Sequence, residues 1–126
     1  MNFLRTIGFV FLVSFAFDAF AQTGTGLIGK YYDTDSFGTL VTTRTDASIN
    51  FDFARSIPSG TGITAATTYS IAWSGQIEAA YSELYTFHVT ADDAARLWVD
   101  DQLIVQRTFF QGSGEMRGQI PVSYTH

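Results

Sequence analysis

The chain has 126 residues, a formal net charge of -5 and no cysteine. This length fits about one domain, since a domain usually takes ~100–200 residues. The acidic balance disfavours nucleic-acid binding, because a negative surface repels phosphate backbones. The lack of cysteine excludes disulfides, thiol catalysis and cysteine-ligated zinc.

The first 21 residues have the pattern of a secretion signal. Arg5 gives a basic start, residues 7–17 are mostly apolar, and residues 19–21 (AFA) form the small-x-small pattern of a signal-peptidase site. The stretch is too short to span a bilayer and carries Asp18. We therefore predict a signal peptide over 1–21, a flexible leader over 22–26 and one domain over 27–126. The mature chain is expected to be secreted or displayed at a cell surface, without membrane insertion.

Short apolar runs separated by turn residues follow, with no helical period, which predicts an all-β domain. Weak strands are expected at 29–32 and 49–53, with loops between them and over 56–68. The clearest strand covers 69–79, because apolar residues alternate there with small or polar ones. Trp73 falls on the apolar face of that strand, so we expect it in the core.

Two hairpins are predicted downstream. Residues 85–90 alternate as a strand, and residues 80–83 would join them to strand 69–79 as a hairpin loop. Residues 95–99 and 103–105 would form the second hairpin, in which a two-residue turn favours glycine where Asp101 stands. A loop over 106–118, with Phe109 and Phe110, and a last strand over 119–124 complete the pattern.

Catalytic arrangements are scarce in this sequence. His88 is the only histidine before the terminal His126 and falls on the polar face of a strand, which does not provide a Ser-His-Asp triad. Ser74 lacks the glycine two residues before it that a nucleophile elbow needs. These residues predict a protein without catalytic activity.

Two pairs of neighbouring aspartates remain, at 92–93 and 100–101. Neighbouring side chains on a strand point to opposite faces, so these pairs are poor acid–base partners for a glycosidase. In a turn, however, two carboxylates can converge on calcium, a hard cation that takes about 6–8 oxygen ligands. Asp92 and Asp93 therefore have two interpretations, a calcium site or a solvated polar turn.

Four segments together resemble the PA14 domain family: 26–32 (GLIGKYY), 43–53 (TRTDASINFDF), 69–77 (YSIAWSGQI) and 85–100 (YTFHVTADDAARLWVD). The last segment is the most specific. The resemblance implies an antiparallel β-sandwich or barrel that is usually non-catalytic and often binds carbohydrate. In the sugar-binding fungal adhesins of the family, the aspartates matching Asp92 and Asp93 hold calcium across a cis peptide bond, and the calcium binds sugar hydroxyls.

The chain departs from the family pattern in two ways. Ala94 stands where the family commonly has glycine, and alanine does not easily take a positive φ. The adhesins draw further calcium ligands from a loop near the end of the domain, whereas this chain ends 33 residues after Asp93. We therefore expect the final strands to be missing. An unpaired edge within 69–105 or at the last strand would then be prone to associate with another chain.

These observations predict a secreted, non-catalytic carbohydrate-binding module with a glycan or polysaccharide partner, and with calcium held by Asp92 and Asp93. Trp98 is expected to pack between the sheets, with stacking on a sugar as the alternative. Arg44 and Asp46 are expected to fix a loop through hydrogen bonds. The alternative function is a structural or protein-interaction domain that supports a neighbouring module.

Overall fold

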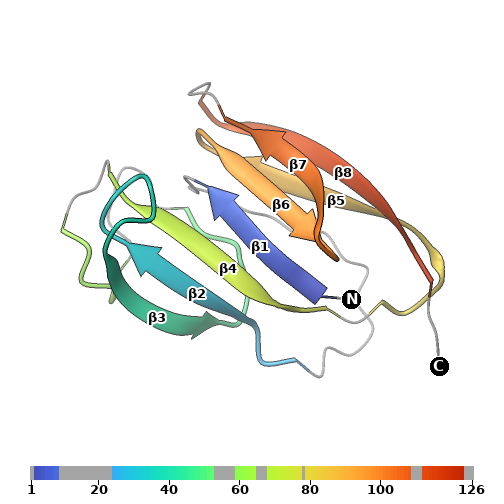
Figure 1. Ribbon diagram of the computed structural model, residues 1–126, viewed down its shortest axis with the longest axis horizontal. Coiled ribbons are helices and arrows are strands. Elements are labelled where there is room, and N and C mark those ends of the chain that lie inside the picture. The colour runs from blue at the N-terminus through green and yellow to red at the C-terminus, as the bar shows by residue number, and fades with distance from the viewer. Residues whose placement is uncertain are drawn as a thin grey trace.

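The computed structural model (Figure 1) describes residues 2–8, 24–52, 59–64, 68–77, 79–108 and 112–123, the first of these segments as backbone only. This part of the chain is built from strands, and it contains no helix long and apolar enough to cross a membrane. The strands are β1 (Asn2–Gly8), β2 (Leu27–Tyr32), β3 (Leu40–Asp46), β4 (Ser70–Gln76), β5 (Glu83–Ala91), β6 (Ala95–Val99), β7 (Gln102–Arg107) and β8 (Gly114–Val122).

The strands form two antiparallel sheets. The larger sheet has six strands in the order β3-β2-β4-β1-β6-β7, and the smaller sheet pairs β5 with β8. In Figure 1 the β5–β8 pair lies over the β6–β7 end of the larger sheet. The predicted all-β, antiparallel sandwich is confirmed.

The core lies on the inner faces of these sheets. Ile71 and Trp73 on β4, Phe87 and Val89 on β5 and Leu97 on β6 are at most 2% exposed. They alternate with residues that face outward, so the period-two pattern in the sequence identified the buried faces correctly. Burial of these side chains from both sheets holds the two layers together.

Several strands differ from the expectation in their presence or bounds. The loop expected after residue 32 contains β3, whose side chains are mostly exposed and whose threonines and valine suit an edge strand. No strand forms at the described residues 49–52, where Ile49 is buried and Phe51 stacks on Trp73 with 6.0 Å between ring centroids. β8 begins at Gly114 instead of residue 119.

The first predicted hairpin is wrong and the second is confirmed. β4 and β5 belong to different sheets, so their connection crosses between the layers instead of closing a hairpin. β6 and β7 pair around a two-residue turn, with Val99 opposite Gln102. Asp100 and Asp101 have φ values of 48° and 63°, the positive sign that a type I′ turn requires. Phe109 and Phe110 lie outside the described residues.

A buried carboxylate ties strands of the larger sheet to a loop. Asp46, at the end of β3, is 7% exposed, and its Oδ2 accepts hydrogen bonds from the Tyr31 hydroxyl (2.6 Å) and the Trp73 indole N–H (2.7 Å). Its Oδ1 accepts one from Arg44 Nε (2.7 Å), and Arg44 Nη1 donates to the carbonyl oxygen of Ser59 (2.9 Å). Arg44 and Asp46 thus fix a loop, as the sequence predicts.

The Tyr31 hydroxyl keeps the proton that it donates to Asp46. Burial first, and then the hydrogen bond to Asp46, raise the pKa of the Tyr31 hydroxyl well above its usual range, so the phenol keeps its proton. The Arg44 guanidinium lies over the Tyr31 ring, with its carbon 4.5 Å from the ring centroid. This cation–π contact adds to the ion pair between Arg44 and Asp46.

Replacing the carboxylate of Asp46 tests how much stability this network provides. All three side-chain partners of Asp46 are donors, so the N–H₂ group of Asp46→Asn must face one of them. We expect a loss of about 3 kcal/mol in the free energy of unfolding, as when one partner of a buried ion pair is removed. The melting temperature should fall by roughly 10–20 °C. Asp35→Asn, at an exposed position, is the matched control and should melt as the wild type does.

β1 occupies the middle of the larger sheet. Its backbone pairs with β4 on one side and with β6 on the other. The same residues lie in the predicted signal peptide, and cleavage of that peptide stays a prediction. Cleavage would leave the facing sides of β4 and β6 without ladder partners.

We expect the exported protein to begin at Gln22 and to self-associate through these two strand edges, because unpaired N–H and C=O groups readily accept another strand. Intact mass spectrometry reports the first residue, and size-exclusion chromatography with light scattering reports the association of residues 22–126. The uncleaved chain is the control and should associate less. A monodisperse monomer of residues 22–126 that melts cooperatively would contradict this prediction.

Candidate functional site

The Asp92–Asp93 turn joins β5 to β6, and both aspartates are half-buried. Asp93 has a φ of 72°, in the left-handed region that aspartate tolerates better than most residues. The family pattern pointed to Ala94 for this conformation, and the structure places it one residue earlier. The peptide bonds of the described residues, that between Asp92 and Asp93 included, are trans.

Arg107, the last residue of β7, holds the main chain of this turn. Its Nε donates to the carbonyl oxygen of Asp93 at 2.5 Å, and its Nη2 donates to the carbonyl oxygen of Ala91. The β6–β7 ladder sets Arg107 opposite Ala95, directly after the turn. The guanidinium therefore ties the end of the larger sheet to the end of β5 in the smaller one.

Gly114 leaves room for this guanidinium. It is the first residue of β8 and lies opposite Ala91 in the β5–β8 ladder. A Cβ atom at position 114 would lie 2.8 Å from Nη1 of Arg107, closer than side-chain carbons approach. Three strands and the turn thus converge on one half-buried cation.

The predicted calcium site can be compared with these contacts. Calcium needs about 6–8 oxygens, and within the described part of the chain no three acidic or histidine side chains come together to hold a metal ion. The carbonyl oxygens of Ala91 and Asp93 already accept hydrogen bonds from Arg107. A turn with two aspartates, whose neighbouring carbonyl oxygens already bind a guanidinium, does not by itself fit a calcium ion, and the calcium site stays a prediction.

Trp98 does not join the aspartates. It lies near the far end of β6 and is half-buried, on the face opposite the fully buried Leu97 and Val99. Its ladder partner on β7 is Leu103, which is 45% exposed. The structure thus places Trp98 on the outer face of the larger sheet. The prediction that it packs between the sheets is wrong.

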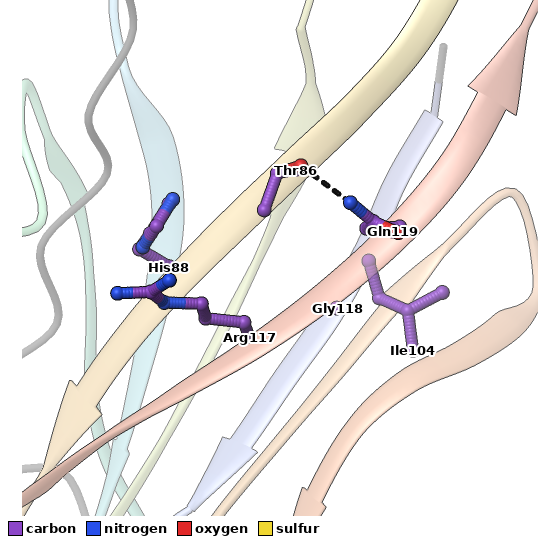
Figure 2. Close-up of a pocket in the computed structure, with 6 residues that line it drawn as sticks. All are labelled: Thr86, His88, Ile104, Arg117, Gly118 and Gln119. Carbon is purple, nitrogen blue, oxygen red and sulfur yellow. Dashed lines mark hydrogen bonds between the residues drawn. The ribbon is translucent and has the colours of Figure 1, made fainter.

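A shallow, largely open cavity of about 600 Å³ lies on the outer face of the β5–β8 sheet (Figure 2). Thr86 lies opposite Gln119 and His88 opposite Arg117 in the ladder, so these four side chains point to the same side. Gln119 Nε2 donates to Thr86 Oγ1 at 3.0 Å. Ile104 of β7 adds an apolar edge next to Gln119. The cavity therefore offers hydroxyl, amide, imidazole and guanidinium groups around one aliphatic side chain.

Glu115 balances the charge at one end of this cavity. Its Oε1 accepts a hydrogen bond from Arg117 Nε at 2.6 Å and lies 3.3 Å from His88 Nδ1. The hydrogen bond from Arg117 first, and then the one with His88, lower the pKa of the Glu115 carboxyl. His88 is thus part of an outward-facing polar row, as expected for a solvated strand residue.

The sequence indicated Asp92 and Asp93 but missed Arg107 and the cavity. Arg107 falls within the predicted loop 106–118, although it is in phase with Val105, which is 4% exposed, on the inner face of β7. A charged side chain in phase with a buried face must find partners. That phase relation is the signal that would have identified Arg107.

Comparisons with known proteins agree with one another. The family model of the PA14 domain matches residues 24–123. The anti-sigma-I factor RsgI3 of Acetivibrio thermocellus is 39% identical over 98 residues, which cover 78% of this chain and 15% of that protein. A solved structure of an anti-sigma factor domain-containing protein superposes with a TM-score of 0.73 at 36% identity, over 79% of this chain and 34% of the other. The chain thus spans a minor part of the relatives it matches.

The conformation of Asp93 allows its carboxylate to be removed without loss of the turn. Glycine adopts a positive φ without steric cost, so Asp93→Gly should change the free energy of unfolding by no more than about 0.5 kcal/mol. Asp93→Val should lose about 1–2 kcal/mol, because a branched side chain disfavours the left-handed region. Urea denaturation of the two variants measures both values. Equal stability of the glycine and valine variants would contradict the left-handed conformation.

Proposed function

The chain belongs to the PA14 domain family, and from this premise we propose that it is a secreted, non-catalytic carbohydrate-binding module of a cell-surface or glycan-processing protein. The cavity on the outer face of β5 and β8 is the observation that carries this proposal. Its volume of about 600 Å³ falls in the usual range for small-molecule sites, roughly 300–1,000 Å³.

The chemistry of the cavity suits a polyhydroxylated ligand. Sugar hydroxyls donate and accept hydrogen bonds, and Thr86, Gln119 and His88 can do both. The guanidinium of Arg117 adds donors, and Ile104 offers an aliphatic contact for the C–H face of a sugar ring. The side chains come from paired strands, so the ladder fixes their spacing.

The aspartate turn directly follows β5, one of the two strands that carry the cavity. Asp92 follows His88 by four residues, which corresponds to about 13 Å along an extended chain. An oligosaccharide that lies along β5 would contact both the cavity and the carboxylates of Asp92 and Asp93. We therefore propose that the turn forms the second part of one glycan surface.

A protein-interaction role is the alternative function. The relatives are named anti-sigma factors, and this chain matches only 15% of the length of RsgI3. A domain that occupies so small a part of a regulator can serve as its ligand-binding part or as a contact for a neighbouring module. The same binding experiment separates the two roles.

The experiment is a glycan array followed by calorimetric titration of the best glycan, in calcium and in chelator. We expect Gln119→Ala to weaken binding about tenfold, the cost of one hydrogen bond of ~1.4 kcal/mol. Asp93→Gly should weaken binding without changing stability. Thr43→Ala, at an exposed position on β3, is the matched control and should bind as the wild type does.

Lack of binding to any glycan would contradict the carbohydrate role and favour the protein-interaction role. Binding that both Gln119→Ala and Asp93→Gly retain would contradict the surface on β5 and β8. A loss in chelator alone would assign calcium to the site.

A further inference from the structure

We infer that the Arg107 guanidinium is the resident cation of the Asp92–Asp93 turn, so that this turn keeps its shape without calcium. The inference rests on the proposed function only in that the same turn is proposed to contact a glycan. Its tests measure the response to calcium and the stability of the turn. The inference and the proposed glycan binding can therefore fail independently.

The first argument is the occupation of the carbonyl oxygens. Main-chain carbonyls are ordinary ligands of calcium in turns. Here the carbonyl oxygens of Ala91 and Asp93, one on each side of Asp92, point to the guanidinium of Arg107. The guanidinium thus binds the two carbonyl oxygens that a bound calcium ion would use as ligands.

The second argument is charge. Arginine stays protonated at every accessible pH, and its planar fork can serve two acceptors at once. Arg107 therefore brings a permanent positive charge to a turn that carries two neighbouring carboxylates. A divalent ion at the same place would meet the repulsion of this guanidinium.

The third argument is that the neighbouring strands make room for this side chain. Gly114 has no Cβ, and one there would lie 2.8 Å from Arg107 Nη1. Arg107 is half-buried and comes from the larger sheet, whereas Ala91 and Gly114 belong to the smaller one. The guanidinium therefore joins the two sheets at the point where the aspartate turn leaves β5.

Thermal melting of the exported protein in chelator and in calcium is the first test. A calcium site of extracellular affinity, with a Kd of about 10⁻⁴ M, would raise the melting temperature by roughly 10 °C at a hundredfold excess of calcium over Kd. We expect the wild type to melt at the same temperature in both solutions. A calcium-dependent rise that Asp93→Gly abolishes would overturn the inference.

The second test is the NMR signal of the Arg107 side chain, which needs no destabilised variant. Its Nε–H, bonded to the Asp93 carbonyl, should exchange slowly with water and keep its chemical shift when calcium is added. The exposed Arg117 Nε–H, with 67% of its side chain exposed, is the internal reference and should exchange faster. Fast exchange of the Arg107 signal, or a shift that saturates with calcium, would overturn the inference.

Substitution of the arginine completes the experiment. Arg107→Met keeps most of the aliphatic stem and removes the charge, so the turn loses its cation, whereas Arg117→Met removes an exposed guanidinium. We expect only Arg107→Met to melt at a lower temperature, and Arg107→Lys to recover part of the loss. Equal melting of both methionine variants would show that Arg107 does not hold the turn.

Discussion

A carboxylate buried between strands must be surrounded by donors, and this requirement fixes one half of the larger sheet. Asp46 receives hydrogen bonds from β2 through Tyr31, from β4 through Trp73 and from its own strand through Arg44. An unpaired buried charge costs several kcal/mol, so the network forms as a whole. A one-residue slip of β2 or β4 would turn Tyr31 or Trp73 to the outer face and leave Asp46 without its donor. The register of β3, β2 and β4 is therefore set by this carboxylate together with the apolar pattern.

Two arginines, one on β3 and one on β7, bind the larger sheet to other segments of the chain. Arg44 donates to the Ser59 carbonyl, and Arg107 donates to the carbonyls of Ala91 and Asp93. In each case a guanidinium that starts on a strand of the larger sheet donates to main-chain carbonyls of another segment. The two differ in their counter-charge, because Arg44 is paired with the carboxylate of Asp46 and Arg107 meets main-chain carbonyls. This difference leaves the charge of Arg107 directed toward the turn that carries Asp92 and Asp93.

Strands with one buried face and one exposed face could be predicted from the sequence. Strands that are mostly exposed or that contain glycines could not. β4, β5 and β6 alternate because Ile71, Phe87 and Leu97 face the core. β3 lies at an edge with most side chains exposed, so it has no such period. β8 does alternate, but its glycines read as a loop; a Cβ at Gly118 would lie 2.3 Å from the Ile104 carbonyl oxygen. The local sequence pattern also does not show whether a strand pairs with the strand before it, so the predicted hairpin between β4 and β5 is wrong.

At the site, Asp92 and Asp93 stood out as neighbours, whereas Arg107 is 14 residues from Asp93 and joins it only through the β6–β7 ladder.

The close contacts of β8 with β7 support the proposal that the cavity and the turn form one surface. β5 and β8 pair over nine consecutive residues without a bulge, so Thr86, His88, Arg117 and Gln119 have fixed spacings. Gly118 lets β8 approach the β7 backbone at Ile104, beside the cavity, and Gly114 lets it approach Arg107, beside the turn. Because both contacts are made between the same two strands, the smaller sheet is held against the larger one at both places. Side chains on such a frame keep their geometry better than side chains on loops. A ligand along β5 would thus meet a surface already arranged for it, and would lose little conformational entropy in ordering the protein.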